Sequence, residues 1–464
     1  MSETFGVVVV GGGAVGENAA ARAVRGGLTV ALVEAELVGG ECSYWACMPS
    51  KALIRTTQAV HAARAVTGVS ASFDPADVLA RRDSFTSGWK DDSQVEWARG
   101  AGITVVRGHA RLTGPRALTV QGGPDLVATH AVVLATGSIP SEPPTPGLAD
   151  TPHWSSREAT SAAAVPGRLA VIGSGVVGCE LAQAYQRLGA AVTLVSRGAA
   201  VLENLEPAAS ELVARGMAAD GVTLHLGADV ARVHRDDAGV HVVLADGTDV
   251  VADELLVATG RRPATADVGV QTVGLEPGAT LEVDDSGLVQ GVDGSWLYAC
   301  GDVTGRAPLT HQGKYAARVV GDVIAARATG APELTQPWGA HAATADHGAV
   351  PQVVFTDPEV AFVGRTAQQV SAAGTAHDVV EIDIAVAGSS LHADGYTGKA
   401  VMVVDSERRT LLGVTFVGQD VAELVHAGTI AIVGEVPLER LWHAVPAYPT
   451  INEVWLRLLE AYGL

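Results

Sequence analysis

Two glycine fingerprints of the form GxGxxG, separated by about 160 residues, constrain the fold of this chain most strongly. Around the first, the continuous apolar run Phe5–Val10 predicts a buried strand, the small residues from Ala14 to about Gly26 predict a helix, and Thr29–Val33 predicts a second strand. The order strand, glycine turn, helix, strand is that of a βαβ unit. This context makes the fingerprint far more specific than the glycines alone.

The glycines of the first turn indicate a dinucleotide site. They are Gly11, Gly13 and Gly16. Because they lack side chains, the backbone and the N-terminus of the following helix can approach a pyrophosphate. Glu34 ends the second strand, eighteen residues after Gly16, where a carboxylate can accept hydrogen bonds from a ribose.

The same pattern recurs near the middle of the chain. Arg168–Ile172 predicts a strand, a helix is expected up to about Leu188, and Ala191–Val195 predicts the next strand. The turn glycines are Gly173, Gly175 and Gly178. The chain is therefore expected to carry two dinucleotide sites.

The two sites differ in the residues that follow the second strand. Ser196 and Arg197 occupy the place that Glu34 has in the first unit. An acid at this place favours a free ribose 2′-hydroxyl, whereas an arginine favours a 2′-phosphate. This predicts NADPH as the nucleotide, although the closing Gly178 is also compatible with NADH.

A cysteine pair lies shortly after the first fingerprint. Cys42 and Cys47 are separated by four residues in GGECSYWACMPSK, a spacing that allows a disulfide if the chain loops or begins a helix there. Pro49 suits a first helical turn, so Cys47 should lie near a helix N-terminus, with Lys51 one turn further on; both features favour a thiolate. We interpret the pair as redox-active rather than as two buried structural cysteines, since the chain has only four cysteines.

Length, charge and hydropathy exclude several classes of protein. The 464 residues, 48% of them hydrophobic, suffice for three domains with sizeable cores. A formal net charge of −20 argues against nucleic-acid binding. We see no basic N-terminal signal and no apolar run of about twenty residues, so we expect a protein without a membrane span. A close cysteine pair in a reducing compartment is more often catalytic than structural, and we expect a cytoplasmic location.

Taken together, these motifs resemble the class I pyridine nucleotide-disulfide oxidoreductases, such as dihydrolipoamide dehydrogenase, glutathione reductase and mercuric reductase. The resemblance covers essentially the whole chain. Besides the fingerprints and CSYWACMPSK, it rests on four segments: LATGSIP with Thr136 and Gly137, VATGRRP with Gly260 and Arg261, YACGDVTG with Asp302, and FTDPEVAFVG.

The resemblance implies an α/β fold with two Rossmann-like dinucleotide-binding domains and a C-terminal α+β dimerisation domain. The FAD-binding domain would cover residues 1–150 and return over 269–340, with the NAD(P)-binding domain at 151–268 between them. The dimerisation domain would cover 341–464, where strand-like segments alternate before a helix-like stretch. A homodimer with active sites shared across the interface is implied, with FAD and NADPH as cofactors.

Roles for several residues also follow from the resemblance. Asp302 would hold the FAD ribityl chain, and Lys51 and Glu180 would pair beside the flavin and nicotinamide. Cys47 would face the flavin and Cys42 the substrate. By contrast, Cys179 and Cys300 lie in an expected helix and at the end of an apolar strand, which predicts small core residues.

The chain departs from this family at its C-terminus. The family motif HPTxxE reads YPTINE here, with Tyr448 in place of the histidine and with Glu453 retained. A phenol with a pKa near 10 is a poor base but a usable proton donor. His443 could substitute, but a histidine outside the matched position is more often structural. Tyr44 and Trp45 replace smaller residues between the cysteines, where they could stack on an aromatic substrate or merely pack.

A tyrosine in this C-terminal region also occurs in mercuric reductases. Their C-terminal cysteine pair is absent, however, because the last cysteine here is Cys300. We therefore expect thiol chemistry rather than metal reduction, and no metal site.

These observations predict an enzyme that passes electrons from NADPH through FAD to the Cys42–Cys47 disulfide, and on to a disulfide or another small-molecule acceptor. Three alternatives stay open. The flavin could reduce a quinone or an unsaturated small molecule directly, as a diaphorase does. The chain could work in the oxidative direction as a dihydrolipoamide dehydrogenase, or serve as a non-catalytic redox sensor.

Overall fold

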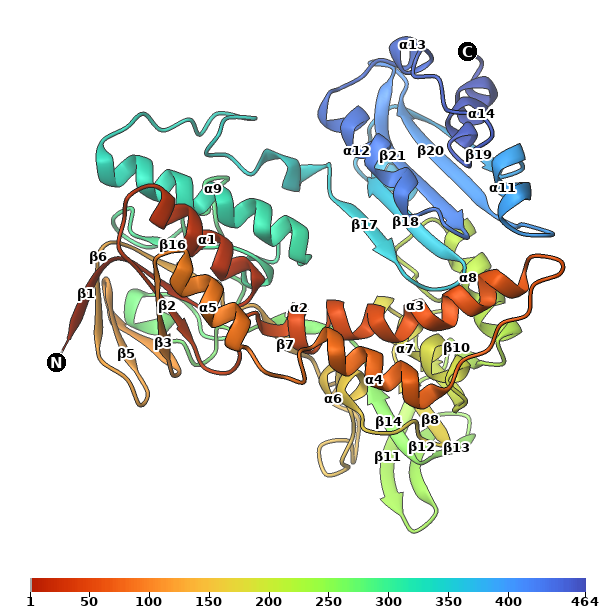
Figure 1. Ribbon diagram of the computed structural model, residues 1–464, viewed down its shortest axis with the longest axis horizontal. Helices are drawn as coiled ribbons and strands as arrows, with labels where there is room; N and C mark the ends of the chain where they lie inside the picture. The colour runs from red at the N-terminus through yellow and green to blue at the C-terminus, as the bar shows by residue number, and fades with distance from the viewer. Residues whose placement is uncertain (1) are drawn as a thin grey trace. The chain divides into compact units, whose positions relative to one another are not determined.

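The computed structural model describes residues 2–464, which form two compact units (Figure 1). The first comprises the chain up to Pro49 together with Asp83–Ser141 and Arg261–Asp346. The second comprises Ser50–Arg82, Glu142–Gly260 and His347–Leu464. The predicted domain boundaries near residues 150, 268 and 340 stay a prediction.

A seven-stranded sheet forms the centre of the first unit, in the order β3-β2-β1-β6-β5-β4, with β16 also paired to β6. Five of its strands pair in parallel, whereas the pairs β4–β5 and β5–β6 are antiparallel. The strands are β1 (Glu3–Val10), β2 (Val30–Glu34), β3 (Ile103–Arg107), β4 (Ala110–Gly114), β5 (Ala117–Val120), β6 (Leu126–Leu134) and β16 (Leu297–Ala299). Residues Val7–Val10 are buried, as expected of a parallel strand covered on both faces.

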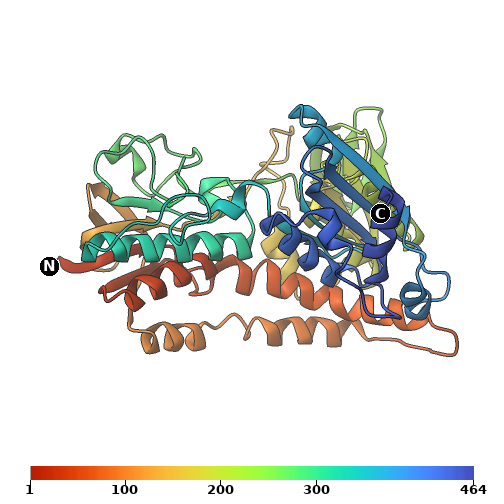
Figure 2. The same cartoon turned by 90° about the horizontal axis from the view of Figure 1, so that it is seen from above.

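Two helices, α1 (Ala14–Arg25) and α9 (Thr310–Thr329), pack on one another beside this sheet and run side by side in both views (Figures 1 and 2). Glycine permits the close approach, because a Cβ at Gly26 would lie 2.3 Å from the Cβ of Ala325. The remaining elements of the unit are α2 (Gly40–Tyr44), α5 (Asp92–Gly100), the antiparallel pair β7 (Ser138–Pro140) and β15 (Arg261–Pro263), and the 3₁₀ turns η1 (Val270–Val273) and η2 (Asp302–Thr304). Helices α3 (Cys47–Arg64) and α4 (Pro75–Phe85) and turn η3 (Thr344–His347) contain unit boundaries.

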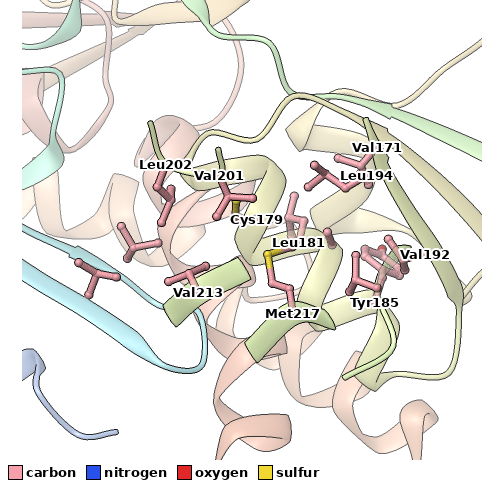
Figure 3. Close-up of a cluster of buried hydrophobic side chains, with 14 of the residues drawn as sticks. Val171, Cys179, Leu181, Tyr185, Val192, Leu194, Val201, Leu202, Val213 and Met217 are labelled. Carbon is pink, nitrogen blue, oxygen red and sulfur yellow. The ribbon is translucent and has the colours of Figure 1, made fainter. Parts of the chain in front are cut away.

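The second unit contains a four-stranded parallel sheet in the order β10-β9-β8-β14 and a three-stranded antiparallel sheet, β11-β12-β13. Their bounds are β8 (Arg168–Ile172), β9 (Ala191–Ser196), β10 (Thr223–Leu226), β14 (Glu254–Val257), β11 (Val230–Asp236), β12 (Gly239–Leu244) and β13 (Asp249–Ala252). Helices α6 (Ser156–Ser161), α7 (Val176–Arg187) and α8 (Pro207–Ala219) accompany them. Figure 3 shows apolar side chains of α7, α8 and the parallel strands converging into one core.

A five-stranded antiparallel sheet completes the second unit, in the order β17-β18-β21-β20-β19. Its strands are β17 (Pro351–Val354), β18 (Glu359–Gly364), β19 (His377–Asp383), β20 (Lys399–Asp405) and β21 (Thr410–Gly418). The associated helices are α10 (Ala367–Ala372), α11 (Ala387–His392), η4 (Ala422–Leu424), α12 (Val425–Val433), α13 (Leu438–Leu441) and α14 (Glu453–Tyr462). The expected fold class of two Rossmann-like units and a C-terminal α+β region is confirmed. Among residues 2–464, every helix is too short or too polar to span a bilayer.

Candidate active site

The first glycine turn, between β1 and α1, leaves no room for a side chain at its first and last fingerprint glycines. Gly11 has φ +100°, and a Cβ on it would lie 2.3 Å from the carbonyl oxygen of Ala135. A Cβ on Gly16 would lie 1.9 Å from the carbonyl oxygen of Gly11. Gly13 is the N-cap of α1, which begins at the next residue. The turn therefore brings a helix N-terminus close to bare backbone, as a pyrophosphate site requires.

Glu34 closes β2 beside this turn. Its carboxylate accepts hydrogen bonds from the backbone N–H groups of Gly12 and Glu36, at 2.6 and 2.7 Å. Burial raises the pKa of Glu34, while these two hydrogen bonds act in the opposite direction. The carboxylate is held at the mouth of the glycine turn, where the sequence places the ribose contact.

The second glycine turn, between β8 and α7, repeats the same geometry. Gly173 has φ +115°, and a Cβ on it would lie 2.3 Å from the carbonyl oxygen of Ala258. A Cβ on Gly178 would lie 2.0 Å from the carbonyl oxygen of Gly173. Gly175 is the N-cap of α7 and faces open space. The two turns thus have matching steric constraints at matching positions.

Ser196 and Arg197, at the end of β9, lie in different environments. Ser196 is buried, and its hydroxyl accepts hydrogen bonds from the Ser174 hydroxyl and the Gly198 N–H, at 2.7 and 3.2 Å. Arg197 is exposed. The serine therefore stabilises the loop, while the guanidinium is available to a ligand.

The two cysteines lie in successive short helical segments. Cys42 belongs to α2, and Cys47 is the first residue of α3, as expected from Pro49. Both are half-buried free thiols, and the hydroxyl of Thr310, the first residue of α9, lies 3.3 Å from the Cys47 sulfur. A hydrogen bond to Cys47 and burial raise the pKa of the Cys42 thiol. The thiols are close enough to interact, which a redox pair requires.

Thr136 and Gly137 follow β6. The Thr136 hydroxyl oxygen is buried and has no hydrogen-bond partner among residues 2–464. Gly137 has φ +73°, a conformation that favours glycine. An unpaired buried hydroxyl is costly, so a bound group that supplies a hydrogen bond would stabilise this loop.

Asp302 takes part in a polar chain that the sequence does not reveal. Ser138 donates a hydrogen bond to the Asp302 carboxylate at 2.6 Å and accepts one from Arg261 Nε at 2.7 Å. Arg261 also donates to the Ser138 carbonyl at 2.6 Å, and lies 3.8 Å from the Glu41 carboxylate, next to Cys42. This series of polar contacts connects Asp302, the predicted ribityl contact, to the segment that contains Cys42. Gly260, the residue before Arg261, has φ +127°.

Lys51 and Glu180 are brought together in the second unit. Lys51 Nζ lies 2.7 Å from Glu180 Oε2, and the other oxygen accepts the Phe355 N–H at 2.9 Å. Lys51 also lies over the Phe355 ring, 4.9 Å from its centroid. Glu180 is only 3% exposed, and each of its carboxylate oxygens has a hydrogen-bond partner inside the second unit. This pairing offsets the cost of burying the charge.

Tyr448 and Glu453 are not joined by a hydrogen bond in this chain. Tyr448 is 76% exposed, whereas Glu453, at the start of α14, is buried. The Glu453 Oε2 has no partner among the described residues. His443 is exposed in the same C-terminal segment.

The other two cysteines, Cys179 and Cys300, are fully buried among apolar side chains, as expected of core residues. Burial raises the pKa of each thiol to about 12, which makes both unreactive. Tyr44 is likewise 3% exposed, and its carbonyl accepts a hydrogen bond from the Trp89 indole at 3.1 Å. Tyr44 therefore packs rather than offering a face to a substrate, while Trp45 beside it is half-buried.

Several residues around the cysteines escaped the sequence analysis. Thr310 begins α9 and contacts Cys47, and Ser138 links Asp302 to Arg261. Glu17, in the first turn of α1, has a buried unpaired oxygen, and burial raises its pKa to about 7. Of these, only Thr310 has a signal in the sequence, because the family resemblance implies a helix soon after Ala307.

Comparison with known proteins decides the family. The family described as pyridine nucleotide-disulphide oxidoreductase matches residues 5–330, and its dimerisation domain matches residues 350–458. The chain belongs to this family. It is a flavin-dependent pyridine nucleotide-disulfide oxidoreductase that binds FAD and NAD(P), as the motifs predicted. The dimerisation-domain match supports a homodimer.

Relatives with known activities align with almost the whole of this chain. It is 31% identical to the dihydrolipoyl dehydrogenase of Haloferax volcanii over 98% of this chain and 95% of the relative. It is 32% identical to the mercuric reductase of Shigella flexneri over 96% of this chain and 79% of that protein. These matches do not favour the alternative of direct flavin transfer.

Solved structures agree in fold. The HOCl-induced flavoprotein disulfide reductase RclA from Escherichia coli, solved as a Cu(II) complex, superposes with a TM-score of 0.84 at 23% identity, covering 99% of both chains. LpdA from Mycobacterium tuberculosis superposes with a TM-score of 0.81 at 24% identity, covering 99% of both chains.

Proposed function

We propose that this family member uses NADPH to reduce a small-molecule disulfide through Cys42 and Cys47. The observation that carries the proposal is the pair of half-buried thiols, Cys42 in α2 and Cys47 at the start of α3, with the Cys47 sulfur 3.3 Å from the hydroxyl of Thr310, the first residue of α9. The core thiols Cys179 and Cys300, in contrast, are sealed from solvent.

The residues around the first glycine turn fit FAD. Gly11, Gly13 and Gly16 leave bare backbone for a pyrophosphate, Glu34 stands at the ribose position, and Asp302 is oriented by Ser138. The unpaired Thr136 hydroxyl is a further contact for a bound group. FAD, when bound, would relay an electron pair from the reduced nicotinamide to the cysteine disulfide.

The substrate half-reaction balances on the two cysteines. The Cys42 thiolate attacks one sulfur of the substrate disulfide, and the other sulfur leaves as a thiolate that takes up a proton. The Cys47 thiolate then attacks Cys42 in the mixed disulfide, which releases the second substrate thiol and restores the Cys42–Cys47 bond. The substrate is reduced by two electrons, and the cysteine pair is oxidised by two.

Thr310 and the N-terminus of α3 stabilise the developing charge in this proposal. The Thr310 hydroxyl can donate to a sulfur anion, and Cys47 as first residue of α3 lies at the positive end of the helix dipole. Because the pKa of Cys42 is raised by its hydrogen bond to Cys47 and by burial, Cys42 needs a proton acceptor before it attacks.

Proton transfer to the leaving thiolate is assigned to Tyr448, with Glu453 as its orienting partner, in the active site of the other subunit of the homodimer. Two features support this assignment. Tyr448 is 76% exposed in a single chain, and the buried Glu453 has an unpaired oxygen. Because a phenol is a donor at neutral pH, we expect it to assist substrate reduction better than thiol oxidation.

The preference for NADPH is assigned to Arg197. Its exposed guanidinium follows β9 directly, where a 2′-phosphate would lie, whereas the neighbouring Ser196 is occupied within the loop. Arg197→Glu should raise the KM for NADPH by roughly tenfold or more while changing the KM for NADH little. Equal effects on both nucleotides would contradict the assignment.

The central experiment is Cys42→Ser in the FAD-loaded protein. We expect loss of NADPH-dependent disulfide turnover with retained flavin reduction under anaerobic conditions. In the unsubstituted protein, NADPH should produce a long-wavelength absorption band from the Cys47 thiolate. Cys300→Ala is the matched control, because that thiol is buried in the core and should leave turnover intact.

Two outcomes would contradict the dithiol proposal. One is full turnover of the physiological acceptor by Cys42→Ser, which would mean that the flavin serves the acceptor directly. The other is flavin bleaching without the long-wavelength band, which would place the cysteines outside the electron path.

A further inference from the structure

A cluster of imidazoles and carboxylates lies on the three-stranded sheet of the second unit, and the proposed reaction does not use it. His234 on β11 and His241 on β12 are direct cross-strand partners. Their rings are stacked, with centroids 4.6 Å apart and planes 18° from parallel. Asp236, on the same strand as His234, and Asp249, the first residue of β13, complete the cluster.

His241 lies between the two carboxylates. Its Nε2 is 3.0 Å from Asp236 Oδ1, and its Nδ1 is 2.9 Å from Asp249 Oδ2. A neutral imidazole donates at only one ring nitrogen. In the protonated ring both nitrogens donate, so a cation that binds at Nε2 displaces the proton shared with Asp236 while Nδ1–H keeps its hydrogen bond to Asp249.

His234 supplies an independent sign of a missing partner. Its Nδ1 is buried and has no hydrogen-bond partner among residues 2–464. An imidazole nitrogen that is shielded from water and unpaired costs free energy. A cation ligated by this nitrogen would relieve the cost, because its lone pair would then have a partner.

The spacing of the ligand atoms suits a small metal ion. One ring nitrogen of each histidine and one carboxylate oxygen of Asp236 all lie within 4.8 Å of one another. Bonds of about 2.0–2.1 Å to a tetrahedral Zn²⁺ place ligand atoms about 3.3 Å apart. Small side-chain rotations would close that gap, because Asp236 lies at the exposed end of β11 and is itself exposed.

We propose that His234, His241 and Asp236 form a divalent transition-metal site, with Asp249 orienting His241. Two imidazoles and one carboxylate are the ligand set of Zn²⁺, and also suit Cu²⁺ and Ni²⁺, rather than Mg²⁺ or Ca²⁺, which take mostly oxygen ligands. The arrangement of Asp249, His241 and metal would be a carboxylate–histidine–metal triad, in which the carboxylate sets the tautomer and ring orientation. Three protein ligands leave further positions for water.

The test is calorimetric titration of ZnCl₂ into the full-length, FAD-loaded protein. Cys42 and Cys47 are also soft metal ligands, so the titration uses a Cys42→Ser/Cys47→Ser background. We expect one Zn²⁺ per chain. His241→Ala or His234→Ala should weaken binding by roughly a hundredfold or more, and Asp249→Asn by about tenfold. His130→Ala, an exposed histidine in the other unit, is the matched control and should leave affinity unchanged.

A second readout separates the site from nonspecific binding. Cu²⁺ added to the same background should give an electron paramagnetic resonance spectrum with coupling to two nitrogens, reduced to one in either histidine variant. The proposal is overturned if no Zn²⁺ binds in the cysteine-free background, or if His234→Ala and His241→Ala both retain the wild-type affinity. Both outcomes are independent of disulfide turnover, which the background lacks.

Discussion

Removing the Glu180 carboxylate should loosen the loop after β17, and the structure indicates by how much. Glu180 is 3% exposed and holds two partners, Lys51 Nζ at 2.7 Å and the Phe355 N–H at 2.9 Å. In Glu180→Ala, the Phe355 N–H loses its acceptor at a cost of about 1–3 kcal/mol. The Lys51 side chain is 35% exposed, so it can regain water, and loss of the ion pair costs only about 0.5–1 kcal/mol.

The expected total for Glu180→Ala is about 1.5–4 kcal/mol of local stability. Glu180→Gln keeps an oxygen for the Phe355 N–H and removes only the charge, so about 1 kcal/mol is expected. Because a tenfold change in an equilibrium corresponds to about 1.4 kcal/mol, amide exchange at Phe355 should accelerate roughly tenfold or more in the alanine variant and about fivefold in the glutamine variant.

Hydrogen–deuterium exchange of the segment around Phe355 is the assay, because it reports this loop without requiring the whole protein to unfold in one step. Glu211→Ala is the matched control, since Glu211 pairs with Arg215 on the exposed surface of α8 and should change nothing. Equal acceleration in the alanine and glutamine variants would refute the reasoning, because it would mean that charge, and not the backbone acceptor, holds the loop.

Two further predictions concern steric and electrostatic features of the second unit. Gly178→Ala should destabilise the nucleotide fold, since its Cβ would lie 2.0 Å from the Gly173 carbonyl oxygen, whereas Gly175→Ala, with open space around it, should fold with an unchanged melting temperature. Burial raises the pKa of Glu359 to about 7 from 4.5. Since the folded pKa lies above the unfolded one, the stability linked to this carboxyl is fully present below pH 4.5 and is lost as the pH rises through about 7. Glu359→Gln should therefore flatten the dependence of melting temperature on pH between these values and gain up to about 3 kcal/mol over the parent at pH 8; a profile identical to that of the parent would show that this carboxyl is not buried as described.

Local features of the chain were predictable from sequence. The strands and helix of each βαβ unit begin and end within a few residues of the predicted positions, because a buried parallel strand requires a continuous apolar run and a glycine turn has few substitutes. The start of α3 at Cys47 likewise follows from Pro49 at a position where no N–H is needed. Family motifs extended these local predictions to cofactors and to a dimerisation domain.

Contacts between distant segments were decided by tertiary structure. The link from Asp302 through Ser138 to Arg261 joins the starts of η2, β7 and β15, which are far apart in sequence, and no local pattern marks Ser138 as their connector. The burial of Tyr44 depends on Trp89 and its neighbours, so its aromatic character alone could not distinguish packing from substrate contact.

The pKa values of the titratable groups were likewise decided by tertiary structure, for a physical reason. A sequence lists the titratable groups of a chain, but the pKa of each depends on the solvent and charges that folding places around it. Glu17 and Glu359 are ordinary glutamates in sequence and acquire pKa values of about 7 only through burial. His234 and His241 are seven positions apart, and they form a cluster only because β11 and β12 pair in the register that sets them face to face. Short-range chemistry determined the elements of this protein, and the packing of distant segments determined which of its side chains meet.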